Sequence, residues 1–229
     1  LKERDSRAHL SSSNVGSLGG LMAVRRGQTH LAGSHLLDTE TGEYNFSYIE
    51  RYLKGIPLRL VQLAYRQQGF LLQPGNPKNI QGIADLVRGD VMFINRQGGS
   101  GTRILLDYTL AQAGMSADAV SGYDQEEFTH MAVAVSVLSG RADAGMAIYS
   151  SARALGLDFI PVAEERYDLV IPESSWDDPK IRLLLEIIGS ESFRRTVTDL
   201  GGYDVRASGT VMGLWDGEHW SHTAGRNER

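Results

Sequence analysis

Cysteine is absent from this 229-residue sequence, which excludes disulfides, thiolate metal sites and cysteine nucleophiles. Long apolar runs are missing too, and none approaches the ~20 residues that a membrane-spanning helix needs. Positive charge is not in excess, because the net charge is −5. That balance argues against a broad basic face for nucleic acid, yet it allows a local positive site for a small anion.

The remaining composition, 41% hydrophobic and 22% charged, is ordinary for a globular protein. The length fits one large domain or two small lobes. Residues 2–7 are typical of the charged end of a helix that begins before Leu1, so the sequence suggests a fragment.

One stretch, residues 90–107, combines a predicted strand, a glycine-rich turn and a predicted helix. Val91 to Ile94 is a short apolar run, Asn95 to Gly101 is polar and glycine-rich, and apolar residues recur at helical spacing from Thr102 onward. The first N–H groups of a helix lack intrahelical acceptors, and the helix dipole favours negative charge there. The stretch therefore predicts an anion site.

The turn also carries side chains suited to an anion: the hydroxyls of Ser100 and Thr102 and the guanidinium groups of Arg96 and Arg103, beside the bare N–H of Gly101. The alternative is an ordinary strand-to-helix turn with Thr102 as the N-cap. The pattern is neither a P-loop, since no lysine follows the glycines, nor a dinucleotide-binding Gly-x-Gly-x-x-Gly.

A second polar turn, residues 11–17, precedes another predicted helix and offers Ser13, Asn14 and Ser17. Its alternative interpretation is plain helix capping by Asn14 or Ser17. Ser34 follows a further predicted strand. Ligands of open α/β sheets bind outside the carboxyl ends of strands, where all three turns are expected.

Strands and helices alternate along the chain, which predicts an α/β fold with mainly parallel sheets. Two strand-to-strand regions, Leu60–Leu72 and Phe159–Ile171, are interpreted as crossings between lobes. We expect lobe I over residues 1–75 and 166–214, lobe II over 76–165, a tail without structure over 215–229, and hinges near 65–77 and 162–167. His219 and His222 in that tail lack the support of a metal site.

Five separated motifs carry a family resemblance: Val15-Gly-Ser-Leu-Gly-Gly-Leu21, Leu31-Ala-Gly-Ser-His-Leu-Leu37, Tyr44-Asn45, Phe93-Ile-Asn-Arg-Gln97 and Gly201-Gly-Tyr203. Together with residues 95–103 they resemble type II periplasmic binding proteins, particularly molybdate and tungstate binders. The likeness is greatest to cytoplasmic relatives fused to molybdopterin molybdenumtransferase-type proteins or helix-turn-helix regulators.

This resemblance implies a two-lobed clamshell with a two-strand hinge, closing on a small oxyanion such as molybdate or tungstate. It implies a cytoplasmic sensor linked to molybdenum-cofactor biosynthesis or its regulation, with a fused partner domain, a possible homodimer, and no cofactor or metal. The ligand residues would be Ser13, Asn14, Ser17, Ser34, Arg96, Ser100, Gly101, Thr102 and Arg103. Gln97 and Gly98 depart from the tungstate-binder pattern, which leaves the ligand open. An extracytoplasmic subunit of an ABC importer and part of a molybdopterin-biosynthesis enzyme are the alternatives.

Candidate catalytic side chains occur outside any known catalytic motif: His35, His130, Asp38, Asp143 and Glu165. His130 is expected to be a satisfied interior histidine, and Asp143 to fix the entry of a strand. The sequence therefore favours a binding domain over an enzyme.

Overall fold

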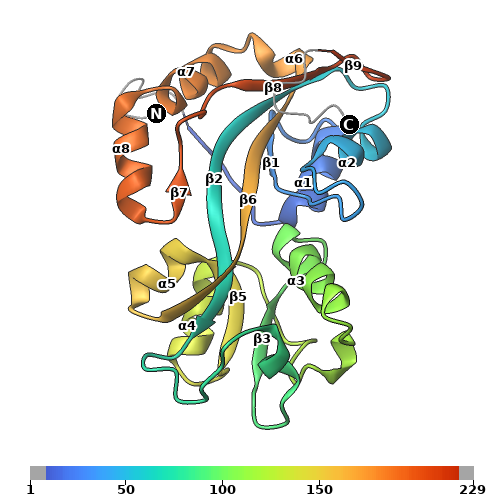
Figure 1. Cartoon of the computed structure of the whole chain (residues 1–229). Helices are drawn as coiled ribbons and strands as arrows, with labels where there is room; N and C mark the ends of the chain where they lie inside the picture. The colour runs from blue at the N-terminus through green and yellow to red at the C-terminus, as the bar shows by residue number, and fades with distance from the viewer. Residues whose placement is uncertain (1–8, 222–229) are drawn as a thin grey trace. The chain divides into compact units, whose positions relative to one another are not determined.

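The computed structural model describes residues 9–221 and divides the chain into two compact units (Figure 1). Unit 1 comprises residues 1–65, 166–199 and 204–229, and unit 2 comprises 66–165 and 200–203. Two strands, β2 (Leu58–Leu72) and β6 (Asp158–Pro172), contribute residues to both units. Each unit is described below by itself.

Unit 1 begins with α1 (Gly16–Arg25), β1 (Ala32–Ser34) and α2 (Phe46–Tyr52). After β6 come α6 (Glu173–Trp176), α7 (Pro179–Ile188), α8 (Glu191–Leu200, whose last residue is assigned to unit 2), β8 (Val211–Trp215) and β9 (Trp220–Ser221). Strand β1 pairs antiparallel with β6, so that Ser34 lies opposite Asp168. This register places a hydroxyl beside a carboxylate, which matters for the site below.

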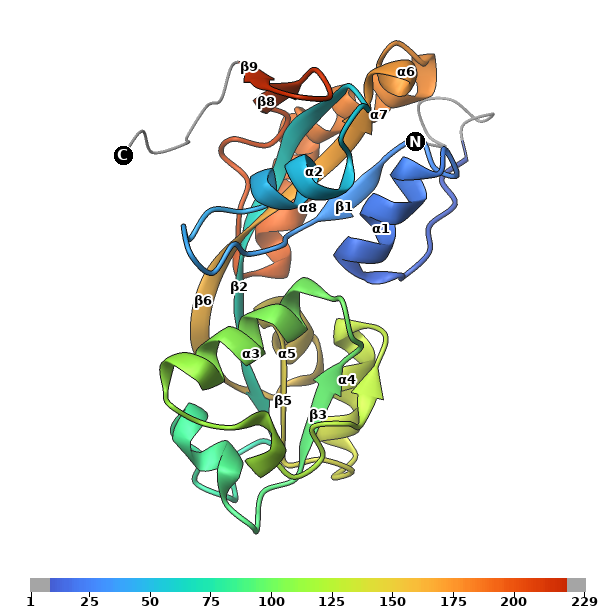
Figure 2. The ribbon, with the colours of Figure 1, turned by 90° about the vertical axis from the view of Figure 1, so that its right-hand side faces the viewer.

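Unit 2 contains the 3-10 helices η1 (Ile83–Val87) and η2 (Ala117–Ala119), the strands β3 (Phe93–Arg96), β4 (Glu126–Glu127) and β5 (Ala144–Ile148), and the helices α3 (Gly101–Gln112), α4 (His130–Leu138) and α5 (Tyr149–Leu155). Figures 1 and 2 show α3 on one side of its sheet and α4 with α5 on the other. Leu71, Ile94 and Ala147 pack against the α4 side.

The expectation of mainly parallel sheets is wrong, because the sheet is mixed. Among the described pairings, β3 is parallel to β4 and β5, whereas β1 with β6, β2 with β5, β2 with β8 and β8 with β9 are antiparallel. The long strands β2 and β6 each connect a segment of unit 1 with a segment of unit 2, and they are not parts of strand-helix repeats. Each therefore lies antiparallel to a strand that precedes a helix, β5 or β1.

Both predicted crossings are single strands of 15 residues. The unit boundaries fall inside these strands, after Tyr65 in β2 and after Glu165 in β6. The predicted hinges and their closing motion stay a prediction. The fifteenth residue of β6 is Pro172, whose missing N–H suits the end of a strand.

Residues 9–15 have no regular structure, and the helix end predicted over residues 2–7 lies outside the described residues. The C-terminal end differs from the sequence prediction. The tail expected without structure over residues 215–229 includes the last residue of β8 and then β9, where Trp220 packs edge-on against Phe46 with ring centroids 4.7 Å apart. Packing of the Trp220 ring stabilises a strand in this segment, which its polar composition did not predict. His219 is exposed, and His222 lies outside the described residues.

Candidate functional site

The turn between β3 and α3 has the geometry expected of an anion site. Gly99 has φ +78°, a conformation that glycine adopts without steric cost. Ser100 is the N-cap of α3, and its Oγ accepts from the Arg103 N–H at 3.2 Å. The predicted capping role of Thr102 is therefore wrong, since Thr102 lies inside the first turn. The N–H groups of Gly101 and Thr102 open the helix without intrahelical acceptors.

Thr102 and two glutamines form a buried polar cluster at this helix start. The Thr102 Oγ1 accepts from Gln68 Nε2 at 2.8 Å, so its own O–H remains available as a donor. Gln68 Oε1 and Gln97 Nε2 are buried and have no hydrogen-bond partner within residues 9–221. Buried amide groups without partners are costly, so this cluster suits additional polar atoms from a ligand.

Arg96 is buried at the end of β3 and holds the segment that leads into α4. Its guanidinium donates to the Glu127 and Phe128 carbonyls at 3.2 and 3.1 Å and to Gln97 Oε1 at 3.1 Å. It also contacts His130 Nδ1 at 3.0 Å, and since a guanidinium only donates, that nitrogen must accept. His130 is thus bonded within the protein, in line with its expected interior role.

Arg103 is similarly engaged, but by carboxylates. Its Nη1 donates to Glu126 Oε1 at 3.1 Å and to the Arg96 carbonyl at 3.2 Å, and its Nε lies 3.6 Å from an Asp107 oxygen. The guanidinium also stacks over the Tyr123 ring, 3.8 Å from its centroid. Acidic neighbours thus offset the positive charge of Arg103, whereas the contacts of Arg96 given above are to two carbonyls, an amide oxygen and an imidazole nitrogen.

In unit 1, the loop after β1 is held by Asn45, at φ +72°. The Asn45 Oδ1 accepts from the Leu36 N–H at 2.8 Å, and its Nδ2 donates to the Ser34 carbonyl at 3.2 Å and to Asp168 Oδ2 at 2.8 Å. Two motifs of the family resemblance, residues 31–37 and 44–45, therefore meet here. Asn45 belongs to the Tyr44-Asn45 motif, but its role in holding this loop was not predicted from the sequence.

Asp168, which accepts a hydrogen bond from Asn45, is completely buried. Burial raises its pKa to about 6, although Arg166, whose Nε donates at 2.9 Å, and Asn45 favour the carboxylate. Its Oδ1 and the Ser34 Oγ are both buried without a partner in the described part of the chain. Because Ser34 and Asp168 are register partners, a hydroxyl and a carboxyl oxygen share one face of the sheet.

The other predicted residues of unit 1 divide into a buried and an exposed set. The Ser17 Oγ accepts from the His35 N–H at 3.2 Å, which ties α1 to the Ser34 loop. Ser13 and Asn14 are exposed. The N-cap of α1 is Val15, without a side-chain cap, so capping by Asn14 or Ser17 is not observed. Tyr167 stacks on His35. A Cβ at position 33 would lie 2.1 Å from the Tyr167 Oη, which explains why this position is a glycine.

The start of α5 explains the third glycine-containing motif of the family resemblance, residues 201–203. Tyr149 is the first residue of α5, which has no side-chain cap, and follows β5 directly. Gly201 and Gly202 pack against Tyr149, because a Cβ at Gly202 would approach the Tyr149 Cβ to 2.8 Å. The Gly-Gly-Tyr motif is therefore explained by close packing on a helix start.

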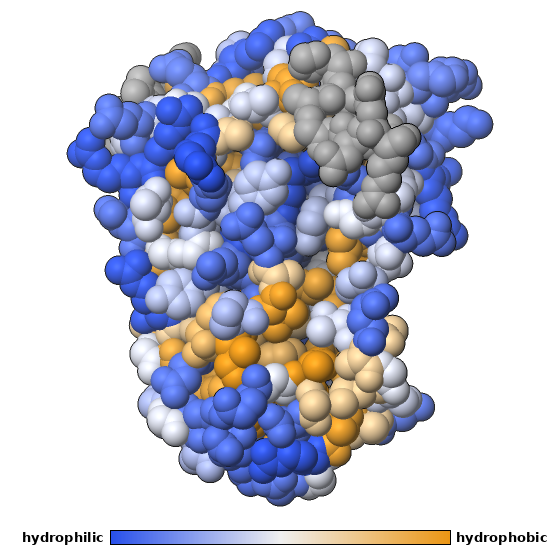
Figure 3. Space-filling view, in the orientation of Figure 1, coloured by the Kyte–Doolittle hydropathy of each residue, from blue (hydrophilic) through white to orange (hydrophobic). Residues whose placement is uncertain are grey.

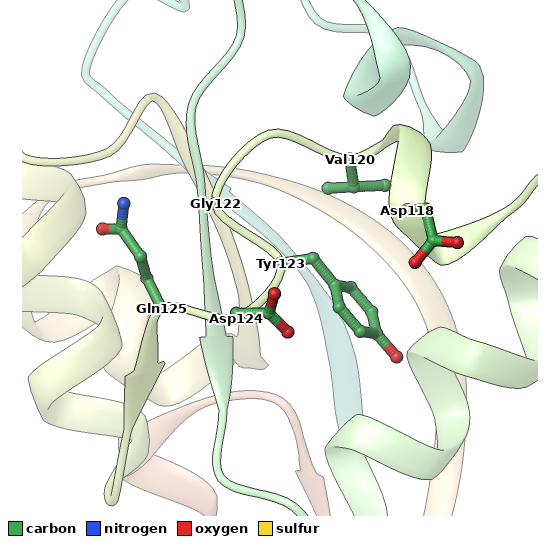
Figure 4. Close-up of a pocket in the computed structure, with 6 residues that line it drawn as sticks. All are labelled: Asp118, Val120, Gly122, Tyr123, Asp124 and Gln125. Atoms are coloured by element: carbon green, nitrogen blue, oxygen red, sulfur yellow. The ribbon is translucent and has the colours of Figure 1, made fainter.

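A separate cavity of about 320 Å³ lies beside the segment between η2 and β4 (Figure 4). It is lined by Asp118, Val120, Gly122, Tyr123, Asp124 and Gln125, none of them a predicted ligand residue. Two carboxylates at its wall make it unsuited to an anion. Asp143, the residue before β5, accepts from the Met92 N–H at 2.8 Å and so ties the entry of β5 to the residue before β3.

Residues 1–189 match the family model described as the PBP superfamily domain. The chain belongs to this family. The resemblance to periplasmic binding proteins is thereby confirmed at the level of the superfamily, whereas the molybdate and tungstate subtype is not established by this match. The family is one of solute-binding domains, so its members' function is to hold a small ligand.

Two bacterial relatives share more than a third of their aligned residues with the chain. YvgK of Bacillus subtilis is 39% identical over 197 residues, covering 86% of this chain and 63% of that protein. A Clostridium pasteurianum protein, named for its place in the 5′ region of a 2Fe-2S ferredoxin gene, is 38% identical over 112 residues, covering 48% of this chain and 97% of its own. The chain thus spans less than two thirds of the B. subtilis relative.

Solved structures share the fold at low sequence identity. A Clostridium perfringens protein assigned as the substrate-binding protein of a phosphate ABC transporter, with bound phosphate, has a TM-score of 0.61 and 14% identity, covering 87% of this chain and 88% of its own. A phosphate transport receptor from Vibrio cholerae has a TM-score of 0.55 and 14% identity, covering 88% and 90%. Within residues 9–221, no helix is long and apolar enough to cross a membrane.

Proposed function

We propose that this chain is the ligand-binding domain of a sensor for a small oxyanion, with molybdate or tungstate as the preferred ligand. The observation that carries the proposal is the start of α3. There the free N–H groups of Gly101 and Thr102, the Thr102 hydroxyl and two nearby guanidinium groups lie together. Membership of a solute-binding family supports a binding role rather than an enzymatic one.

In this proposal the ligand's oxygens accept bonds from backbone N–H groups and hydroxyls. Arg96 and Arg103 supply positive charge and hold the turn, since hydrogen bonds within the protein already engage both guanidinium groups. Ser17 and Ser34 in unit 1, with the exposed Ser13 and Asn14 ahead of α1, are the second proposed set of ligand residues.

The biological setting of the proposal comes from the resemblance. We place the domain in the cytoplasm, acting with a DNA-binding or molybdopterin-enzyme domain in molybdenum-cofactor biosynthesis or its regulation. The second candidate is the solute-binding subunit of an importer for phosphate, which the fold likeness to two phosphate transport proteins favours. The two candidates differ in the preferred anion.

Isothermal titration calorimetry with molybdate, tungstate, sulfate and phosphate tests the proposal. The expected result is saturable binding of molybdate or tungstate, at least ~100-fold tighter than sulfate, a difference of about 2.7 kcal/mol. Preference for phosphate would support the importer candidate instead. Binding of none of the four would contradict an oxyanion site of either kind.

A further inference from the structure

Gln97 lies between β3 and the glycine turn, and all but one of its polar atoms form hydrogen bonds within the protein. Its N–H donates to the Glu127 carbonyl at 3.3 Å, its carbonyl accepts from the Ser100 N–H at 3.2 Å, and its Oε1 accepts from Arg96 Nε at 3.1 Å. Only Nε2 has no partner within residues 9–221, although Gln97 is just 5% exposed. The NH2 group of Gln97 is therefore a buried and unused donor.

The orientation of the Gln97 carboxamide is fixed by Arg96. A guanidinium group donates hydrogen bonds and accepts none, so the carboxamide atom that faces Arg96 Nε is the oxygen. The reverse orientation would set two donors against each other. The free end of the carboxamide is therefore the NH2 group, which suits an acceptor such as an oxyanion oxygen.

The glycine turn brings Gln97 back to the start of α3. The bond from the Ser100 N–H to the Gln97 carbonyl closes a four-residue turn, and Gly99 has the φ of +78° that a type II turn requires at its third residue. The Cα atoms of Gln97 and Ser100 are then less than about 7 Å apart. Since Ser100 is the N-cap, the Gln97 side chain begins close to the free N–H groups of Gly101 and Thr102.

A second buried carboxamide reaches the same helix start from β2. Gln68 donates from Nε2 to the Thr102 Oγ1 at 2.8 Å, and its own Oε1 has no partner in the described part of the chain. Because a hydroxyl both accepts and donates, Gln68 can present either its oxygen or its nitrogen to a ligand, whereas Gln97 presents only a donor. Unused polar atoms thus gather at the start of α3 from two strands, which points to a polar occupant.

The strand that leads to Gln97 comes from an apolar core. Phe93 and Ile94 of β3 are fully buried, and hydrophobic residues are also gathered over part of the surface of unit 2 in the view of Figure 3. An unpaired donor in such surroundings is costly, and its bond to an anion is stronger than in water.

We propose that Gln97 is a ligand-binding residue at the start of α3, where its Nε2 donates a hydrogen bond to an oxygen of the bound anion. The proposal rests on the oxyanion site proposed above and adds a donor that is not among the ligand residues predicted from the sequence. The anion gains a partner for one more oxygen, and Gln97 gains the bond that its NH2 group lacks.

Arg96 is in this arrangement a positioning residue. Bonds to the Glu127 and Phe128 carbonyls hold it in place, and its Nε donates to the carboxamide of Gln97. A charged donor polarises the amide that accepts from it, which makes the amide N–H groups stronger donors. The positive charge of Arg96 thus strengthens binding through the Gln97 carboxamide.

Isothermal titration calorimetry of the whole chain tests Gln97 directly, with whichever of molybdate, tungstate, sulfate and phosphate the wild type binds most tightly. Gln97→Glu keeps an oxygen that accepts from Arg96 and replaces the NH2 group with a second oxygen. We expect affinity to fall more than ~100-fold, because a donor to the anion becomes a repelling carboxylate. Gln97→Met, which has neither group, should weaken binding roughly 10- to 150-fold.

Gln125→Glu is the matched control, since it adds the same charge to the same unit at an exposed glutamine. It should leave affinity within ~2-fold of the wild type. Thermal melting without anion separates binding from folding. Gln97→Glu should melt no lower than the wild type, because it keeps the bond to Arg96 and loses the unpaired donor.

The outcomes separate the role of Gln97 from the proposed function. A wild type that binds none of the four anions contradicts the oxyanion site itself, and the role of Gln97 with it. A wild type that binds an anion, with Gln97→Met and Gln97→Glu both within ~2-fold of its affinity, overturns the role of Gln97 alone, and an internal water would then satisfy Nε2. An equal loss in Gln97→Glu and Gln125→Glu overturns it as well, since net charge would explain the effect.

A double-mutant cycle tests the positioning role of Arg96. Arg96→Ala should weaken binding by roughly 10- to 150-fold in the wild type, but by less than about 3-fold in Gln97→Met, where the amide that transmits its charge is missing. A merely structural role of Arg96 would give the same factor in both chains, and that result would overturn its action through Gln97.

Discussion

Each unit has a turn that carries hydroxyl groups, and the side chains that hold these two turns in place differ in the sign of their charge. In unit 1 the carboxyl group of Asp168 holds Asn45, which holds the loop of Ser34. In unit 2 the guanidinium of Arg96 holds the carbonyls of the segment that enters α4. A carboxyl group therefore fixes the turn in unit 1, and a guanidinium group fixes the turn in unit 2. This difference predicts that pH acts mainly on unit 1, whereas removal of positive charge acts mainly on unit 2.

The largest expected effect is that of Asn45→Ala on stability. This change removes three buried hydrogen bonds and places a less suitable residue at φ +72°. We expect the free energy of unfolding to fall by roughly 4 kcal/mol, because the Leu36 N–H and the Asp168 carboxyl lose a partner. Urea denaturation measures it.

Asn76→Ala is the matched control for this change. Asn76 also has a positive φ, of 44°, and bonds the backbone of Ile80 twice, but in a half-buried loop of unit 2. We expect a loss of roughly 1–2 kcal/mol there. Equal losses for Asn45→Ala and Asn76→Ala would show that the buried carboxyl adds nothing to the role of Asn45.

The second effect is the pH dependence of Asp168. Since its pKa is raised from 3.8 to about 6, the folded state binds more protons than the unfolded state between these values, and stability falls as pH rises through this window. We expect the stability of the wild type relative to Asp168→Asn to fall by roughly 2.4 kcal/mol from pH 4 to pH 7. Carboxyl groups with lowered pKa affect both proteins alike.

Urea denaturation at several pH values between 4 and 7 measures this difference. Parallel curves for the wild type and Asp168→Asn would mean that the buried carboxyl titrates at its ordinary value. The relative position of the two curves at one pH is not the test, since Arg166 also loses its partner in the variant.

Arg96→Ala should act on binding. If the α3 start holds an oxyanion, loss of this charge weakens binding by roughly 10- to 150-fold, as expected for 1.5–3 kcal/mol. Arg103→Ala should have a smaller effect, because Glu126 and Asp107 already offset that charge. Calorimetry with molybdate measures both, and Arg141→Ala is the control. Unchanged affinity in both variants would leave the turn a simple helix cap.

The smallest effect on stability is expected for Ser34→Ala. The Ser34 Oγ has no hydrogen-bond partner in residues 9–221, so its removal should change the free energy of unfolding by less than about 0.5 kcal/mol. Binding of the oxyanion should nevertheless weaken by roughly 5- to 10-fold, the value of one neutral hydrogen bond. A variant that loses stability but keeps its affinity would assign Ser34 to structure alone.

Local patterns predicted the helices and strands of unit 2 well. The run from Val91 to Leu110 became β3, a glycine-containing turn and α3, because apolar periodicity and glycine positions act within a few residues. The N-cap of α4 is equally local, since the Thr129 Oγ1 accepts from the Ala132 N–H three residues on. Sheet direction was not predictable in this way, since pairing joins residues such as Ala32 and Val170.

Only some of the residues proposed to form the site can be identified from the sequence. Ser100 and Thr102 stand out because hydroxyls at a helix start have a local function. Asn45 and Asp168 do not, because their roles depend on a contact between residues 123 positions apart. Arg96 was recognised as a charge, but its bonds to carbonyls over 30 residues away required the fold.

The discontinuity of unit 1 has a consequence for synthesis on the ribosome. Unit 2 draws almost all its residues from one segment, 66–165, whereas β8 must reach Leu58 with Trp215 before the sheet of unit 1 is complete. Unit 2 can therefore fold while the chain is still being made. The residues of unit 1 that precede Arg66 cannot complete their sheet until β8 has been synthesised. During that delay, β1 and the first half of β2 present unpaired edges, which makes the nascent chain dependent on protection from aggregation.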